Sequence, residues 1–179
     1  MAGAGRSRRA WGWHPLADSW AARIVTATGV RPGELVLDIG AGHGALTRHL
    51  VAAGARVLAV EPHAGRAERL RASFADQAVT VLPIEAGAVR WPARPFRVVA
   101  SPPFSIASEL VTQLLSHPGG LVAADLVLQR AAVRSFVDGR GPAHWHRRWQ
   151  LVAGRSVPRQ AFRRPPTVDS RVLMIRRRR

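Results

Sequence analysis

The most constraining feature of the chain is a strand-like run that ends in a glycine-rich loop. Residues 35–39 read Leu-Val-Leu-Asp-Ile and are apolar apart from the aspartate. Glycines follow at alternate positions, Gly40, Gly42 and Gly44, and a helical spacing of apolar residues begins at residues 45–51. Short apolar runs are typical of buried parallel strands, and the glycines mark a tight turn into the next helix. The unit predicts a nucleotide-cofactor site at the carboxyl end of a first strand.

The spacing of the loop glycines distinguishes between two classes of cofactor. Dinucleotide-binding loops read G-x-G-x-x-G and seat a pyrophosphate on the N-terminus of the helix. Here the third glycine comes one residue earlier, and Asp38 stands where its charge would face a pyrophosphate. A cofactor with a cationic or zwitterionic end fits better, and S-adenosylmethionine is such a cofactor. A glycine-rich turn without a ligand is the alternative for this motif taken alone.

Composition narrows the class of protein. The 179 residues are enough for one domain with a sizeable core, and we expect a basic, disordered arm over residues 1–10 and a single domain over residues 11–179. Cysteine is absent, which excludes disulfides and thiolate metal ligands. No segment reaches the length of a membrane span and no signal peptide opens the chain. We therefore expect a monomeric cytoplasmic protein that does not contact membranes.

The charge is strongly positive and unevenly distributed. Lysine is absent, so all 27 basic residues are arginines, and the net charge is +16. A GC-rich genome explains arginine in place of lysine but not the excess of bases over acids. Residues 130–179 carry 14 arginines and 2 acids, against 13 arginines and 9 acids in residues 1–129. This basic end predicts a surface for a polyanion such as nucleic acid.

Strand and helix patterns alternate along the chain. We expect helices near residues 18–28 (capped by Asp18), 45–51, 63–74, 105–116 and 130–137, and strands near residues 35–39, 56–60, 79–83, 96–100, 121–129, 149–154 and 171–176. This alternation predicts a Rossmann-like, doubly wound α/β fold with a seven-stranded sheet and right-handed crossovers. Glu61 follows the second strand, 23 residues after Asp38, near the offset of an acid that binds ribose hydroxyls. Glu85 follows the third strand.

The fourth strand ends at Ser101-Pro102-Pro103-Phe104. The two prolines stiffen the turn and aim the preceding carbonyl groups outward, while Phe104 offers a flat face on which a base can stack. The exocyclic amine of a base is a poor nucleophile because its lone pair is delocalised into the ring. The carbonyls of Ser101 and Pro102 would accept hydrogen bonds from that amine and favour its attacking geometry without an acid or base. A proline-rich surface turn is the alternative.

Further segments resemble a known family. They are Gly12-Trp13-His14 with Leu16-Ala17-Asp18, the loop from Asp38 to Thr47, and the set Phe162, Pro166, Val168 and Ser170. With the turn at residues 101–104, they make the chain resemble the erythromycin-resistance (Erm-type) ribosomal RNA adenine-N6 methyltransferases. These enzymes are relatives of the small-subunit ribosomal RNA adenine dimethylases. The resemblance covers about residues 7–177.

The resemblance implies the fold of class I S-adenosyl-L-methionine-dependent methyltransferases. It also implies methyl transfer to N6 of an adenine in 23S ribosomal RNA, which confers macrolide, lincosamide and streptogramin B resistance. The residues implied to border the cofactor are His14, Leu16, Asp38, Gly40, Gly42, Glu61 (ribose), Glu85 (adenine) and Ser101. Those implied to act in catalysis are Ser101, Pro102, Phe104 and Phe162, with Phe104 stacking on the flipped adenine and Phe162 supporting its other side. No metal is implied.

The chain departs from the family pattern in three places. Trp13 and Pro15 replace a glutamine and a phenylalanine, and Ser101-Pro102 replaces Asn-(Leu/Ile), which keeps both backbone carbonyls. The sequence also stops where the sheet ends, without the family's C-terminal helical domain. We therefore expect the basic C-terminal third to hold RNA, through Arg140, Arg147, Arg148, Arg163, Arg164, Arg176, Arg177, Arg178 and Arg179.

Other interpretations stay open from the sequence. Residues 140–149 interleave arginines with Trp145 and Trp149, which fits either an RNA-stacking platform or a core tryptophan beside a solvated face. His144 and His146 lack a third metal ligand nearby. The chain could also methylate a planar nitrogen of a protein side chain, or bind RNA as an assembly factor without catalysis. The intact loop, Glu61 and Phe104 argue against the last of these.

Overall fold

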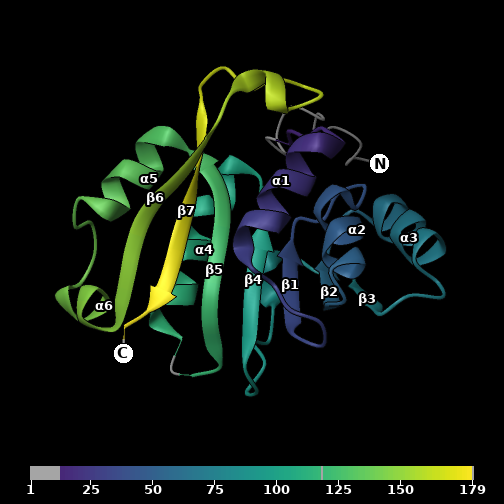
Figure 1. The fold of residues 1–179 in the computed structure, drawn as a ribbon, viewed down its shortest axis with the longest axis horizontal. Helices are drawn as coiled ribbons and strands as arrows, with labels where there is room; N and C mark the ends of the chain where they lie inside the picture. Colours follow the sequence, from purple (N-terminus) through teal and green to yellow (C-terminus); the bar gives the residue numbers. More distant parts are fainter. Residues whose placement is uncertain (1–12, 118, 179) are drawn as a thin grey trace, which may run out of the picture.

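The computed structural model describes residues 13–117 and 119–178. The predicted arm over residues 1–10, Gly12 and Arg179 lie outside the described residues. One seven-stranded sheet runs through the molecule in the order β3-β2-β1-β4-β5-β7-β6 (Figure 1). Strands β1 to β5 are parallel, and β7 runs antiparallel to both β5 and β6. The expected doubly wound, seven-stranded α/β fold is confirmed.

The strands are β1 (Leu35–Ile39), β2 (Arg56–Val60), β3 (Val79–Leu82), β4 (Phe96–Ala100), β5 (Leu121–Gln129), β6 (Trp149–Val157) and β7 (Ser170–Arg177). The helices are α1 (Asp18–Thr28), α2 (Ala45–Ala52), α3 (Ala64–Ser73), α4 (Phe104–Ser116), α5 (Arg130–Val137) and α6 (Ala143–Arg148), with short 3₁₀ turns η2 (Ala86–Ala88) and η3 (Arg159–Ala161). The predicted boundaries of the five parallel strands agree with these to within one residue.

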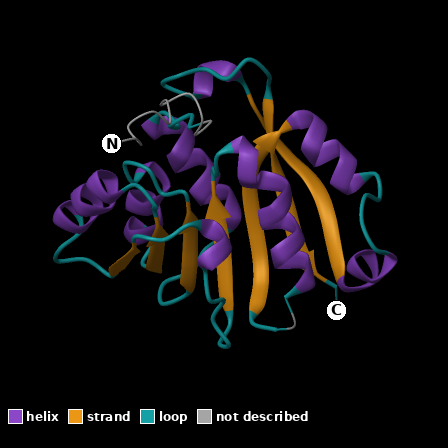
Figure 2. Ribbon diagram, turned by 180° about the vertical axis from the view of Figure 1, so that it is seen from behind, coloured by secondary structure: helices purple, strands orange, loops and turns teal. Residues whose placement is uncertain are grey.

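The sheet is buried on both faces, as its continuous apolar strands require. All five residues of β1 are buried. Leu35, Leu37 and Ile39 point into one apolar cluster, which also contains the inner residues of α4, α5 and α6. Val36 points into the other, which contains the inner residues of α1, α2 and α3. The first of these two helix layers faces the reader in Figure 2.

The local structure differs from the sequence expectations at two places and decides an alternative that the sequence left open at a third. Asp18 does not cap α1: it is the first helical residue, and its carboxylate accepts from His49 Nε2 at 3.0 Å. Helix α6 was not expected, because Gly141-Pro142 reads as a loop and the six residues that follow are too few to show helical periodicity. Trp145 and Trp149 are both buried, at 5% and 0% exposure, so neither indole offers a platform to a base.

The strand ends form two opposite sides of the sheet, which we call its carboxyl edge and its opposite edge, and different residues lie at each. The carboxyl ends of β1 to β5 meet at the upper edge in Figure 1. Strand β7 begins beside that edge, where Ser170 pairs with Gln129, and ends at the opposite one, where Arg176 pairs with Ala123. The nine residues of β5 separate the edges by about 26 Å. This separation decides which arginines lie near a ligand at the upper edge.

Two absences hold for the part of the chain that the structure describes. None of its helices is long and apolar enough to cross a membrane. None of its His, Asp and Glu side chains form a group of three that could hold a metal ion.

Candidate active site

The predicted site residues gather at the carboxyl edge of the sheet. Asp38 lies in β1, Glu61 follows β2, Glu85 follows β3 and the Ser101–Phe104 turn follows β4. Gly40 and Gly42 have φ of 77° and 59°, in the left-handed region that glycine adopts without strain. A Cβ on Gly40 would lie 3.1 Å from Pro103 Cδ. The glycine loop and the Ser101–Phe104 turn are therefore in direct contact.

Asp38 is a buried acid poised near neutral pH. Its side chain is almost fully buried, and its Oδ2 accepts a hydrogen bond of 2.7 Å from the Thr47 hydroxyl. Burial raises the pKa of Asp38 to about 7, although the hydrogen bonds from Thr47 favour the ionised form. A cationic group placed beside Asp38 would complete its ionisation. The loop therefore presents a carboxylate suited to an ammonium group.

Glu61 holds the glycine loop in place. Its Oε2 accepts from the Gly42 amide at 2.9 Å, and its Oε1 accepts from the His63 amide at 2.9 Å and from Arg66 Nη2 at 2.8 Å. The residue is 2% exposed. Buried carboxylates need such partners, because an unpaired buried charge is strongly destabilising. Glu61 thus links β2 to the loop after β1.

Two cavities flank the loop. The larger, of about 490 Å³, is lined by the predicted cofactor residues His14, Leu16, Asp38, Gly40 and Ser101, together with others that include Arg163 and Arg164. The smaller, of about 100 Å³, contains Gly40, Glu61 and Glu85 in its lining. Trp13 lines both. All of the predicted cofactor residues except Gly42 border these cavities, and Gly42 lies against Trp13.

The Ser101–Phe104 turn lies next to a cluster of aromatic rings formed by Phe104, His14 and Phe162. Phe104 is the first residue of α4, half-buried, and its ring centroid lies 5.5 Å from that of His14. His14 lies 6.3 Å from Phe162 on its other side, and its Nδ1 is 2.8 Å from the carbonyl oxygen of Arg164. Phe162 is 3% exposed and pairs with Leu16 in an isolated β-bridge. In this conformation Phe162 supports His14 and has no free face for a base.

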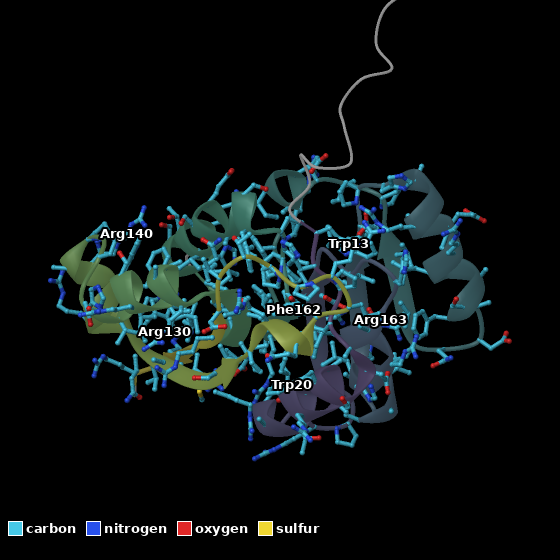
Figure 3. The ribbon with its side chains drawn as sticks, turned by 90° about the horizontal axis from the view of Figure 1, so that it is seen from above. Trp13, Trp20, Arg130, Arg140, Phe162 and Arg163 are labelled. Carbon is cyan, nitrogen blue, oxygen red and sulfur yellow. The ribbon has the colours of Figure 1, made fainter. Side chains whose placement is uncertain are left out.

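The nine arginines predicted to bind RNA do not form one surface. Arg163 and Arg164 are exposed beside the larger cavity, at the carboxyl edge of the sheet, as Figure 3 shows for Arg163. Arg140 follows α5 and covers the ring of Phe136 at 5.2 Å. The others that the structure describes, Arg147, Arg148, Arg176, Arg177 and Arg178, lie at the opposite edge.

Two of the arginines at the opposite edge, Arg176 and Arg178, make contacts that stabilise the fold. Arg176 pairs with the buried carboxylate of Asp125 at 2.8 Å, and burial raises the pKa of that aspartate. Arg178 Nε donates to the carbonyl of His146 at 2.8 Å, at the end of α6. These contacts stabilise the end of the sheet. A role of the two residues in RNA binding stays a prediction.

Two residues that contact the acids of the site, Thr47 and Arg66, were not predicted from the sequence. Thr47 was quoted only as part of the loop motif, and Arg66 was not identified at all. A hydroxyl nine residues after Asp38, in the first turn of the next helix, was the available signal for Thr47. Nothing in the spacing of Arg66 distinguished it from Arg69 or Arg71 on the same helix.

Comparisons with known proteins identify the family and several relatives of the chain. The sequence profile of the family described as ribosomal RNA adenine dimethylase matches residues 7–179. A ribosomal RNA small subunit methyltransferase A of Leifsonia xyli is 35% identical over 164 residues, which cover 83% of this chain and 58% of the relative. The mycinamicin-resistance protein MyrB of Micromonospora griseorubida is 36% identical over 162 residues, covering 88% of this chain and 50% of the relative.

The fold comparison also finds a ribosomal RNA methyltransferase. The crystal structure of the 23S rRNA methyltransferase ErmE superimposes with a TM-score of 0.83 at 28% identity, over 92% of this chain and 70% of that one. The chain thus spans only 50 to 58% of the length of the two sequence relatives. The profile match over nearly the whole chain nevertheless shows that the protein belongs to the ribosomal RNA adenine dimethylase family.

Proposed function

We propose that the protein transfers a methyl group from S-adenosylmethionine to N6 of an adenine in ribosomal RNA. The observation that carries this proposal is the contact between the glycine loop and the Ser101–Phe104 turn, seen at Gly40 and Pro103. A cofactor bound at the loop and a base bound at the turn would therefore lie side by side. Methyl transfer needs this proximity, because holding two reactants in line supplies much of the rate enhancement.

The residues present suit the cofactor. Gly40 and Gly42 hold the loop in a left-handed conformation without strain, and Asp38 offers a carboxylate to the ammonium group of the methionine end. Glu61 and Glu85 line the smaller cavity, where they would bind ribose hydroxyls and the adenine amino group. When bound, the cofactor supplies an electrophilic methyl group.

The catalytic turn would prepare the target base. The backbone carbonyls of Ser101 and Pro102 would accept the two hydrogens of the adenine amine and turn its lone pair toward the methyl group. Phe104 would stack on the base after it leaves the RNA. No side chain in the turn acts as a general base, so geometry and electrostatics carry the reaction. The N–C bond would form as the bond between the methyl group and the sulfur breaks, and the nitrogen would then lose its proton to water.

Large-subunit RNA is the target that we propose, with resistance to macrolide, lincosamide and streptogramin B antibiotics as the consequence. The similarity to ErmE and to a mycinamicin-resistance protein supports it. The similarity to a small-subunit methyltransferase defines the competing target. A planar nitrogen of a protein side chain is a third substrate class, since Pro-Pro-Phe turns suit such nitrogens as well.

Tritiated methyl transfer separates these possibilities. The protein is incubated with labelled S-adenosylmethionine and, in parallel, with 50S particles, 30S particles, free ribosomal RNA and total protein. We expect label in 23S RNA. Label confined to 16S RNA would contradict the large-subunit target, and label confined to protein would contradict the RNA substrate. Absence of transfer to all four, from a folded protein that binds RNA, would identify a non-catalytic RNA-binding or assembly factor.

A further inference from the structure

We propose that the indole of Trp13 occupies the ribose position of the cofactor cleft in the free protein and sets cofactor affinity by having to move aside. The inference rests on the cofactor assignment made above. It concerns a residue that has no counterpart in the family pattern, where a glutamine stands. Trp13 was noted in the sequence only as a departure from that pattern.

The first observation is the position of the indole against the glycine loop. A Cβ built on Gly42 would lie 2.7 Å from Trp13 Nε1 and 3.2 Å from its Cε2. The indole edge therefore rests directly on the Gly42 backbone. In a loop of this kind glycine serves to let a ligand approach the main chain. Here the Trp13 side chain occupies the space next to the Gly42 main chain that a ligand would otherwise use.

The second observation is the division of the cleft. The cavity that contains Asp38 and the one that contains Glu61 and Glu85 share only two lining residues, Trp13 and Gly40. The smaller cavity has a volume of about 100 Å³. A ligand whose methionine end meets Asp38 and whose adenine end meets Glu85 must cross the position of the indole. Trp13 therefore lies between the two positions that such a ligand would have to occupy.

The third observation is the set of contacts that holds the indole. The Arg66 guanidinium lies 5.0 Å from the centroid of the Trp13 ring, while its Nη2 donates to Glu61 at 2.8 Å. His43 packs edge-on against the ring at 4.8 Å. The indole thus stacks on the guanidinium of Arg66, which in turn pairs with Glu61, the residue expected to bind ribose. Cation–π contacts of this kind are worth about 0.5–1 kcal/mol at exposed sites and more when desolvated.

These contacts make a prediction about affinity. The free protein must give up the Trp13–Arg66 and Trp13–His43 contacts before the cofactor can span the cleft. A binding-competent state that is only partly populated weakens the apparent affinity by that fraction. Shortening the side chain to the glutamine of the family pattern removes this requirement. Trp13→Gln should therefore bind the cofactor more tightly than the wild type.

The experiment compares Trp13→Gln and Trp13→Phe with a matched control, Trp20→Gln. Trp20 is half-buried on α1, also lies under an arginine (Arg23, at 5.3 Å) and lines neither cavity. Calorimetric titration with S-adenosylmethionine should show affinity raised roughly 3- to 10-fold in Trp13→Gln. Trp13→Phe should fall between the two, and Trp20→Gln should equal the wild type.

Tryptophan emission gives a second readout. The cofactor should change the emission of the wild type and of Trp20→Gln, and the change should be lost in Trp13→Phe. Unchanged or weaker binding by a folded Trp13→Gln protein would overturn the proposal, because the indole would then be neutral or a clamp on the cofactor. If neither the wild type nor Trp13→Gln binds the cofactor, the cofactor assignment fails and the proposal fails with it.

Discussion

At the scale of single residues, the acids of the site owe their properties to burial and to their hydrogen-bond partners. The sequence places Asp38 and Glu61 correctly, since each ends or follows a parallel strand. Their chemistry depends on Thr47 and Arg66, which reach them through the fold. Sequence spacing predicts which backbone positions converge on one edge. It does not predict which side chain completes a buried carboxylate.

Replacing Glu61 tests its double role. Glu61→Ala should weaken S-adenosylmethionine binding by at least about 1 kcal/mol, because a charge-assisted hydrogen bond to the ligand is lost. It should also lower the stability of the protein, since the Gly42 and His63 amides and Arg66 lose their acceptor. Calorimetry and thermal unfolding measure the two effects. Unchanged cofactor affinity in a folded Glu61→Ala protein would contradict the ribose assignment.

The raised pKa of Asp38 predicts a pH dependence of stability. In the unfolded chain this carboxyl titrates near 3.8, and in the folded protein near 7. The folded state therefore binds the extra proton between these values, and stability falls as pH rises from about 4 to about 7. The shift sets an upper limit of about 4 kcal/mol on this change.

Thermal unfolding between pH 4 and pH 8 checks this dependence. Asp38→Asn keeps an acceptor for Thr47 and removes the titration. Its melting temperature should vary less over this range than that of the wild type. Parallel curves for the two proteins would show that Asp38 does not titrate there.

At the scale of elements, periodic patterns predicted the parallel sheet and missed the parts that tertiary packing determines. The apolar runs of β1, β2 and β4 are unambiguous because both faces of each strand are buried. Helix α6 has only six residues, and its buried Trp145 looks the same in the sequence as an exposed aromatic. Whether an indole binds a ligand or fills a core depends on what packs over it. The sequence alone left that choice open for Trp145 and Trp149.

The turn between β4 and α4 predicts a separation of catalysis from cofactor binding. Phe104→Ala should greatly reduce methyl transfer to RNA and leave S-adenosylmethionine affinity nearly unchanged, because base stacking is worth about 1–3 kcal/mol per base. Ser101→Asn should retain activity, since the proposed acceptors are backbone carbonyls. Steady-state transfer assays and cofactor titrations measure both. A wild-type rate in Phe104→Ala would show that the ring does not hold the base.

At the scale of the whole molecule, the distribution of arginines over two opposite edges limits how RNA can bind. A base at the Ser101–Phe104 turn places its strand along the carboxyl edge, close to Arg163 and Arg164. The basic residues around α6 lie at the opposite edge of the sheet, about 26 Å away along the strands. Only some of the arginines in residues 130–179 therefore lie next to the site, so the net charge of this segment does not measure the RNA surface there. Only the folded structure separates the two groups.

Paired substitutions test this division. Arg163→Gln with Arg164→Gln should weaken binding of a short RNA hairpin and lower the slope of log affinity against log salt by about 1 for each lost phosphate contact. Arg147→Gln with Arg177→Gln, which removes the same charge at the opposite edge, should leave hairpin binding unchanged. Cofactor affinity should change in neither. Equal salt slopes for the two double variants would contradict the division.

The chemical identity of the methylated product is the most direct test of the proposed function. RNA from 50S and 30S particles is digested to nucleosides after incubation with S-adenosylmethionine and either the wild type or Phe104→Ala, and methylated adenosines are measured by mass spectrometry. We expect N6-methylated adenosine in 23S RNA with the wild type and little or none with Phe104→Ala. Methylation at another atom, or equal yields from the two proteins, would contradict the claim that the Ser101–Phe104 turn presents adenine N6 to the cofactor.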